Sequence, residues 1–254
     1  MKILFLSDLH YNLPGKPFHG IDESVAFSWV EEVVETEKPD LILSAGDWGV
    51  LATPGMFRRI LMSALLYTVY GNHDSYETLK AIVNLDQSPC LLEDGRPRVI
   101  GGILRVGGIG GNFGTGRRWH HMRHEQFSLL AEQLAARGLD IFITHEPPEL
   151  CAPDRKMKFG WAEVTKAVEK VGPKLHLCGH FHCDSILAEL GPTIILKLDS
   201  SQTRKQYAVA DYREGGFQGL ELKKLSEGKV KVLASRKDAI DVQELTRTGE
   251  GREG

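Results

Sequence analysis

Short apolar runs rich in valine, isoleucine, leucine and aromatic residues recur along the chain, and five of them stop at residues that can bind a metal. The runs cover 3–6, 41–43, 67–70, 141–143 and 175–177. Runs of this length and composition, bounded by turn residues, are typical of buried β-strands. If these strands lie in one sheet, the polar residues after them meet at the sheet edge where ligands bind in open α/β folds. The pattern therefore predicts a metal centre built by a sheet.

The segments between these runs have the periodicity of helices. Residues 23–37 place a set of apolar side chains on one helical face: Val25, Trp29, Val30, Val33 and Val34. Further helices are predicted over 54–64, 76–85, 124–137 and 160–171. Gly138 and Gly172 are expected to end the last two. Residues 98–109 carry Gly101 and Gly102 between β-branched stretches, which predicts a hairpin.

From residue 184 onward the pattern changes to strands separated by short turns. The predicted strands cover 185–190, 193–198, 206–211, 219–225 and 229–234. Consecutive strands with short connections favour antiparallel pairing. Strand–helix units followed by a meander predict one domain over residues 1–245, and the polar, glycine-rich residues 246–254 are expected to fray.

The composition narrows the class of protein. The chain has 254 residues with 42% apolar and 26% charged residues, which is ordinary for a globular protein. The net charge of −3 argues against a surface coated with basic residues for non-specific nucleic-acid binding. The apolar run at the N-terminus is too short for a signal peptide, and no stretch reaches the roughly 18 apolar residues of a membrane span. We expect a cytoplasmic protein with reduced cysteines and no membrane segment.

The first two polar motifs say little when each is taken alone. Asp8 and His10 are two residues apart, and on an extended strand both would point to the same side and hold one cation. Such a tripeptide is also common by chance. Asp47, which follows Gly46, is equally well explained as a turn aspartate.

The next motifs are more specific. Asn72, His73 and Asp74 crowd together after a strand, where each side chain needs polar partners, although a polar turn explains them about as well. His180 and His182 follow an apolar strand and form a pincer for a borderline metal.

A structural zinc site that uses the flanking Cys178 and Cys183 is the alternative explanation for that last motif. Such a site needs a second pair of cysteine or histidine ligands at finger-like spacing. Cys90 and Cys151 are isolated in the sequence and do not provide it.

Taken in order along the chain, the motifs resemble those of the calcineurin-like metallophosphoesterase family. They are Asp8-x-His10, Gly46-Asp47, Gly71-Asn72-His73-Asp74, His145 and Gly179-His180-x-His182, within roughly residues 1–200. Residues 144–148, Thr-His-Glu-Pro-Pro, resemble the form found in compact, cap-less members. The resemblance implies an α/β fold: a four-layer αββα sandwich with two mixed β-sheets, the metallo-dependent phosphatase fold.

The resemblance also implies roles for single residues. Asp8, His10 and His182 would hold one divalent metal ion. Asn72, His145 and His180 would hold a second ion, and Asp47 would bridge the two. Manganese is the metal expected first, with iron, zinc or nickel as alternatives. A bridging hydroxide would attack phosphorus, His73 would protonate the leaving oxygen or stabilise the transition state, and Asp74 would fix the tautomer of His73.

Residues 117–124 concentrate arginine and histidine around Trp119. An exposed polar loop explains this stretch at least as well as function does. The functional interpretation is a substrate lip, where Arg117, Arg118 and His120 bind phosphate and Trp119 stacks a base. Asn12, just past His10, is expected to line the pocket. The glycine-rich residues 107–114 lack the Gly-Lys-Ser/Thr of a phosphate-binding loop and are expected to form a turn near the site.

We therefore expect a metal-dependent phosphoesterase whose small-molecule substrates are phosphodiesters such as nucleotides, because no large insertion would cover the site. A phosphomonoesterase is the nearest alternative. A DNA or RNA nuclease of the same fold is favoured by the basic loop and disfavoured by the net charge. A non-catalytic scaffold is disfavoured because every ligand position is filled.

Overall fold

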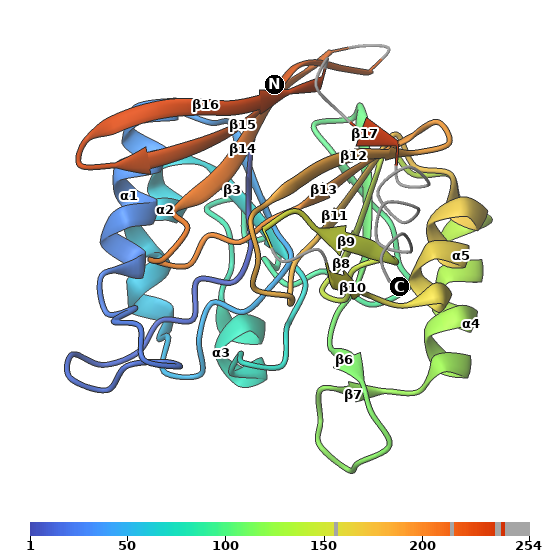
Figure 1. The fold of residues 1–254 in the computed structure, drawn as a ribbon, viewed down its shortest axis with the longest axis horizontal. Helices are drawn as coiled ribbons and strands as arrows, with labels where there is room; N and C mark the ends of the chain where they lie inside the picture. The colour runs from blue at the N-terminus through green and yellow to red at the C-terminus, as the bar shows by residue number, and fades with distance from the viewer. Residues whose placement is uncertain (155–156, 214–215, 237–239, 242–254) are drawn as a thin grey trace, which may run out of the picture.

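The computed structural model describes residues 1–154, 157–213, 216–236 and 240–241. The predicted tail at 246–254 lies outside these residues. Two mixed β-sheets face each other in the middle of the molecule (Figure 1). In the first sheet, the strand order is β16-β15-β14-β1-β2-β3, and in the second it is β17-β12-β13-β11-β8-β5-β4.

The strands of the first sheet are β1 Lys2–Leu6, β2 Leu41–Ser44, β3 Leu65–Thr68, β14 Gln206–Arg213, β15 Gly216–Ser226 and β16 Lys229–Ser235. Those of the second are β4 Arg98–Ile100, β5 Leu104–Ile109, β8 Ile141–Thr144, β11 Leu175–Cys178, β12 Ile186–Leu190, β13 Thr193–Lys197 and β17 Ile240–Asp241. Two short pairs lie apart from the sheets: β6 Asn112–Phe113 with β7 His121–Met122, and β9 Leu150–Ala152 with β10 Met157–Phe159.

Helices cover the outer faces of both sheets (Figure 1). The helices on the side of the first sheet are α1 Ala26–Glu37, the 3₁₀ turn η1 Pro54–Phe57, α2 Arg58–Ser63 and α3 Tyr76–Ala81. Those on the side of the second sheet are α4 His124–Ala135 and α5 Ala162–Val171. This arrangement is the four-layer αββα sandwich that the sequence predicts.

The central strands of the sheets separate two apolar layers. In β1, Ile3 and Phe5 face the core between the sheets, while Leu4 and Leu6 join the layer under α1. This alternation is the period of two that a pleated strand imposes. A third apolar layer, which includes Phe142 of β8, lies between the second sheet and α4 and α5. Because both faces of the central strands are buried, their sequences read as continuous apolar runs rather than as alternating ones.

The hairpin over residues 98–109 and the helix end at Gly172 are confirmed. The helix predicted over 76–85 stops at Ala81, because the next residues cover the free edge of β3. The Asn84 side chain makes the hydrogen bonds that a neighbouring strand would make to Leu66. Its Oδ1 accepts from Leu66 N at 2.8 Å, and its Nδ2 donates to Leu66 O at 3.0 Å. The helix predicted over 54–64 opens as the 3₁₀ turn, and the one predicted over 23–37 begins at Ala26.

The predicted meander is right for its hairpins and wrong between its second and third strands. β12 pairs antiparallel with β13, and β14, β15 and β16 pair antiparallel in turn. However, β13 belongs to the second sheet and β14 to the first, so the chain changes sheets between Lys197 and Gln206. The glycine-rich stretch is also different from the expectation, because residues 107–109 belong to strand β5 instead of a turn.

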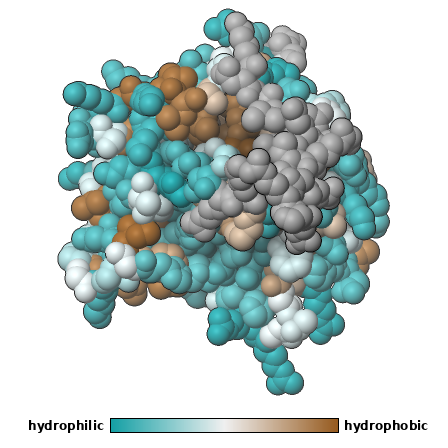
Figure 2. Space-filling view, in the orientation of Figure 1, coloured by the Kyte–Doolittle hydropathy of each residue, from teal (hydrophilic) through white to brown (hydrophobic). Residues whose placement is uncertain are grey.

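Apolar side chains gather on the surface over β15 and β16 (Figure 2). Val230, Val232 and Leu233 of β16 keep between 37% and 49% of their surface exposed, because β16 is the edge strand of the first sheet. No helix in the described part of the chain is long and apolar enough to cross a membrane.

A buried carboxylate fastens helix α1 to the first sheet. Glu37, at the end of α1, accepts hydrogen bonds from Lys2 Nζ at 2.7 Å, Tyr207 OH at 2.9 Å and Lys223 Nζ at 3.2 Å. Burial alone would raise the pKa of Glu37, but these three donors outweigh burial and hold the pKa below its ordinary value. The ionised carboxylate therefore stabilises the native state.

We expect Glu37→Ala to lower the free energy of unfolding by about 2–3 kcal/mol, because it leaves buried donors without an acceptor. Urea unfolding followed by circular dichroism measures this loss. The contribution of a carboxylate with a lowered pKa is present above its ordinary pKa and is lost as the pH falls through the lowered value. The difference between wild type and variant should therefore shrink in acid. Glu35→Ala, an exposed position on the same helix, is the matched control and should unfold like the wild type.

Candidate metal centre

The five polar motifs all lie at the carboxyl ends of neighbouring parallel strands, on the side of the molecule that is lowest in Figure 1. The loops continue the strand pairing beyond the sheets. Asp8 N donates to Gly46 O at 3.1 Å and His10 N to Asp47 O at 2.8 Å, so the loops after β1 and β2 are held in register. In the second sheet, Gly179 N donates in the same way to His145 O at 3.1 Å. The ligand-bearing loops are thus a rigid extension of the two sheets.

Two groups of candidate ligands form there, and each draws on both sheets. The first consists of Asp8, His10 and His182, and the second of Asp47, His145 and His180. In each group, one ligand atom from every residue lies within 4.8 Å of the others. Asn72 joins the second group, with its Oδ1 3.1 Å from His145 Nε2. No cysteine of the described residues belongs to either group.

Asp47 lies between the two groups. Its Oδ2 is 3.7 Å from His10 Nε2 in the first group and 3.3 Å from His145 Nε2 in the second. The same oxygen is buried without a hydrogen-bond partner, and so are both ring nitrogens of His10. Buried polar atoms are normally paired, so orphans of this kind indicate a missing partner. Carboxylate oxygens and imidazole nitrogens are ligands for divalent transition metals, and the residues present therefore fit a pair of such ions.

The ligand residues are held in an unusual backbone conformation. Asp8, His10, Asp47 and His180 have φ angles of 59°, 49°, 58° and 65°. Asp8 and His10 do not lie on an extended strand as their spacing predicts, because both residues are in the left-handed region. Their side chains still converge, with Asp8 Oδ1 3.6 Å from His10 Nε2. Each such residue costs on the order of 1 kcal/mol or more, a strain that is found mainly at functional sites.

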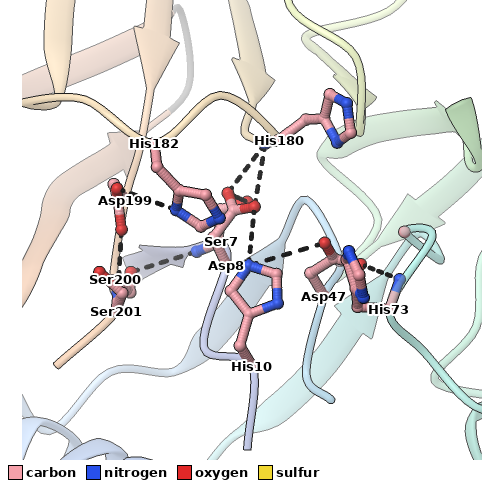
Figure 3. Close-up of polar contacts among 12 residues, drawn as sticks. Ser7, Asp8, His10, Asp47, His73, His180, His182, Asp199, Ser200 and Ser201 are labelled. Carbon is pink, nitrogen blue, oxygen red and sulfur yellow. Dashed lines mark hydrogen bonds and ion pairs between the residues drawn. The ribbon is translucent and has the colours of Figure 1, made fainter. Parts of the chain in front are cut away.

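Asp8 is fixed by donors from both sheets (Figure 3). Its Oδ2 accepts from Ser7 Oγ at 2.7 Å, and both of its oxygens lie 3.0 Å from His180 N. Gly179 permits this approach. A Cβ at Gly179 would lie 1.9 Å from Ser7 Oγ and 2.2 Å from Asp8 Oδ2, so no other residue fits without moving the carboxylate.

The electrostatics of the site favour a cation. Burial alone would raise the pKa of Asp8 and Asp47, but neighbouring imidazoles, His145 among them, outweigh burial and hold both pKa values well below the ordinary range. Burial would lower the pKa of His145, yet the charges of Asp47 and Asp8 raise it to about 10. Two buried, ionised carboxylates thus attract positive charge, which protons supply in the absence of metal.

Comparisons with known proteins agree with this geometry. The family model for calcineurin-like phosphoesterases matches residues 1–184. The chain belongs to the calcineurin-like phosphoesterase family. Membership supports a metal-dependent phosphoesterase in general terms, and the two ligand groups fit the divalent metal ions that the family implies. No curated protein matches the chain.

Solved structures support the same fold. One superposes with a TM-score of 0.64 at 15% identity, covering 89% of this chain and 99% of that chain. TT1561 of Thermus thermophilus gives 0.59 at 17% identity, covering 91% and 97% of the two chains. GAP50, the anchor in the inner membrane complex of Plasmodium, gives 0.54 at 12% identity, covering 97% and 93%. At these identities the likeness shows the fold alone.

In this member of the family, Asp74 has different partners from those expected. Its Oδ2 accepts from Asp47 N at 2.8 Å and from Gly71 N at 2.7 Å, and its Oδ1 from Trp48 N at 2.7 Å. Both oxygens are occupied by backbone donors, so the expectation that Asp74 fixes the tautomer of His73 is not met. Asp74 instead fastens the loop that carries Asp47 to the loop that carries Asn72.

His73 lies beside the two groups without belonging to either. Its backbone N donates to Asp47 Oδ1 at 2.7 Å, and its ring meets the ring of His10 edge-on at 5.3 Å. Burial is the main cause that lowers the pKa of His73, to about 4. The ring is therefore neutral near pH 7, and a neutral imidazole still donates one hydrogen bond.

Phe18 is a residue of the site that the sequence analysis missed. It stacks on the ring of His10 at 4.3 Å with an interplanar angle of 11°, and it meets His73 edge-on at 4.8 Å. The loop over residues 11–22 holds it there through paired backbone hydrogen bonds between Phe18 and Ile21. Nothing in this irregular loop marks Phe18 in the sequence, because its position depends on the loop conformation.

Buried carboxylates behind the ligands were also missed. Asp199 Oδ2 lies 3.2 Å from His182 Nδ1, and Glu146 Oε2 lies 3.9 Å from His180 Nε2. At 3.2 Å, Asp199 orients the His182 ring and fixes its tautomer, whereas Glu146 at 3.9 Å makes no hydrogen bond with His180 and acts through its charge. Asp199 directly follows the apolar run that ends at Leu198, so the pattern that revealed the ligands applies to it as well. Glu23 is also buried nearby, and burial raises its pKa to about 7.

The predicted substrate residues lie around the site without joining the ligand groups. Asn12 is buried, and its Nδ2 donates to Ile21 O at 3.4 Å, so it supports the loop that carries Phe18. Arg117 and Arg118 are exposed on the loop between β6 and β7. His120 on the same loop is buried, with its Nδ1 2.7 Å from Asn112 Oδ1.

We expect Gly179→Ala to abolish metal binding by the first ligand group, because the added Cβ displaces the Asp8 carboxylate. Metal content after dialysis, measured by elemental analysis, should fall from two ions to one or none. Gly55→Ala is the matched control, since a Cβ there meets no atom within 4 Å. Full metal content in Gly179→Ala would contradict the assignment of Asp8 as a ligand.

Proposed function

We propose that this protein is a hydrolase that cleaves phosphodiesters of small molecules, such as nucleotide esters, with two divalent metal ions. The observation that carries the proposal is the position of Asp47 Oδ2, an unpaired buried oxygen between two groups of metal ligands. A single metal site would need no shared carboxylate of this kind. Two ions that share a ligand polarise the phosphate oxygens and lower the pKa of water.

We divide the proposed ligands into two sets, and the geometry of the two groups supports this division. Asp8, His10 and His182 hold one ion, while Asn72, His145 and His180 hold the other. Asp47 is shared by both. Manganese is the metal that we would test first, since ligands of mixed nitrogen and oxygen type without thiolate suit several ions of the first transition row.

His73 is the proposed donor to the leaving oxygen. Its ring is close to the ligand His10, yet it is not itself in either group. A neutral ring with a low pKa does not store an extra proton at pH 7. Its N–H instead donates a hydrogen bond to the leaving oxygen as that oxygen gains negative charge, and the leaving oxygen takes its proton from water.

We expect His73→Ala to lower kcat with manganese by about 10²- to 10³-fold, the range for loss of one hydrogen-bond donor that stabilises the transition state. Steady-state kinetics on bis-p-nitrophenyl phosphate at a saturating metal concentration measure this loss, and elemental analysis should find the metal content unchanged. His124→Ala, which lies outside both ligand groups, is the control. A variant that keeps wild-type turnover would remove His73 from the mechanism.

The walls of the site favour a phosphodiester over a monoester. Among the described residues, no arginine or lysine forms an ion pair with Asp8 or Asp47. The ring of Phe18 stacks on His10, and the carboxylates nearest the ligand imidazoles are those of Asp199 and Glu146. A diester carries one negative charge and two organic groups, whereas a monoester dianion brings a second charge close to these acids.

Like charges repel more strongly in a partly buried site than in water. We therefore expect the kcat/KM for bis-p-nitrophenyl phosphate to exceed that for p-nitrophenyl phosphate by about tenfold or more. The metal-stripped protein, reconstituted with manganese, is the material for both assays. Faster cleavage of the monoester would make the protein a phosphomonoesterase.

A further inference from the structure

Three aromatic rings form a corner beside the metal centre. The rings of Tyr70 and Tyr76 meet edge-on at 5.6 Å, and Trp119 lies 5.4 Å from each of them. Trp119 is 49% exposed and Tyr76 is 38% exposed. We call Tyr70, Tyr76 and Trp119 the aromatic corner. Large rings left in contact with water at one place indicate a binding surface.

The corner is built by firm contacts. Tyr70 OH donates to Asp94 Oδ2 at 2.8 Å, and Tyr70 O accepts from Gly111 N at 2.7 Å. A Cβ at Gly110 would lie 2.5 Å from the Tyr70 ring, so this glycine lets the backbone of the second sheet pack closely against the ring. These contacts therefore hold the Tyr70 ring in place, and the more exposed rings of Tyr76 and Trp119 pack against it.

The corner joins the metal centre through two segments of the chain. Tyr70 precedes the candidate ligand Asn72 by two residues, and Trp119 is adjacent to His120, whose ring lies 5.4 Å away. Helix α3, which begins at Tyr76, and the β6–β7 loop lie on the same side of the molecule as the ligand loops (Figure 1). The segment that carries the candidate ligand Asn72 therefore also carries one ring of the corner.

A cleft of about 520 Å³ opens along Tyr70 and Tyr76. Its volume is in the range of sites for small molecules. Its charged lining is balanced, with Lys80 and Arg98 on one side of the count and Glu93 and Asp94 on the other. A second phosphate group would gain little net attraction there, whereas a neutral planar ring with donors and acceptors finds partners of both kinds.

We infer that the aromatic corner and its cleft bind the nucleobase of the substrate, by stacking on the exposed rings of Trp119 and Tyr76. The inference rests on the proposed function and narrows its substrates to nucleotide esters. Base–aromatic stacking tolerates different bases because every base has a flat face. The corner therefore selects for a base without selecting strongly among bases.

The test compares two esters that share the p-nitrophenol leaving group and differ in the base. They are the p-nitrophenyl ester of thymidine 5′-monophosphate and methyl p-nitrophenyl phosphate. The manganese-loaded wild type should prefer the nucleoside ester in kcat/KM by about five- to hundredfold, the range for one stacked base. Trp119→Ala should lose this preference through a higher KM and should cleave the methyl ester as the wild type does. Trp119→Phe, which keeps a ring, should retain most of the preference.

Equal losses on both esters in Trp119→Ala would overturn the inference, because the rings would then only hold the β6–β7 loop against the β3–α3 segment. A wild type without preference for the nucleoside ester would also overturn it.

If the wild type cleaves neither ester, the proposed function fails, and a binding experiment tests the inference separately. Titration calorimetry of the metal-loaded protein should then show tighter binding of thymidine 5′-monophosphate than of ribose 5-phosphate, and Trp119→Ala should remove the difference. Equal binding of the two phosphates by the wild type would overturn the inference.

Discussion

The contact between the carboxylate of Asp8 and the backbone N–H of His180 is where the two sheets meet at their functional edge. Asp8 follows β1 in the first sheet and His180 follows β11 in the second. The apolar core between the sheets fixes their separation, and at their carboxyl ends the core gives way to buried charge. A buried carboxylate must find donors or positive charge. Because Asp8 and Asp47 find only imidazoles, N–H groups and a serine hydroxyl, the same constraint that joins the sheets also leaves room for cations.

This site is built at a cost in conformational free energy. Four of the proposed ligands occupy the left-handed region, and the unpaired atoms of His10 and Asp47 forgo hydrogen bonds. The surrounding backbone holds the strain, since the loops after β1 and β2 are hydrogen-bonded to each other through Asp8 and His10. A rigid sheet on either side makes such a conformation persist when an isolated loop would relax. Departures from ordinary backbone conformation and hydrogen bonding are expected at functional sites, and here they gather around the candidate ligands.

The ligand positions could be predicted from the sequence because each follows a buried strand, and strands of one sheet end together. The fold class was predictable from the same runs and from the resemblance of the motifs. The partners of Asp74 could not be predicted from the sequence. A carboxylate next to a histidine in the chain can bind backbone N–H groups as readily as it can bind the histidine ring. Phe18 and the change of sheet after β13 depend on loop conformation and on tertiary packing, which leave no periodic signal. Asp199 could have been predicted as a residue of the site, because it also directly follows an apolar run.

The segment from Tyr70 to Asp74 combines several tasks in five residues. It contains one ring of the aromatic corner, the candidate ligand Asn72, the proposed donor His73 and the carboxylate that fastens two ligand loops. We expect changes in this segment to alter metal binding at Asn72, catalysis at His73 or substrate binding at Tyr70, so it has little freedom to vary. The loop between β6 and β7 carries Trp119 and none of the ligands. Loops on a rigid scaffold can change without loss of the fold. Substrate preference in this protein should therefore be adjustable through the loop that carries Trp119, while the chemistry remains fixed by the ends of the strands.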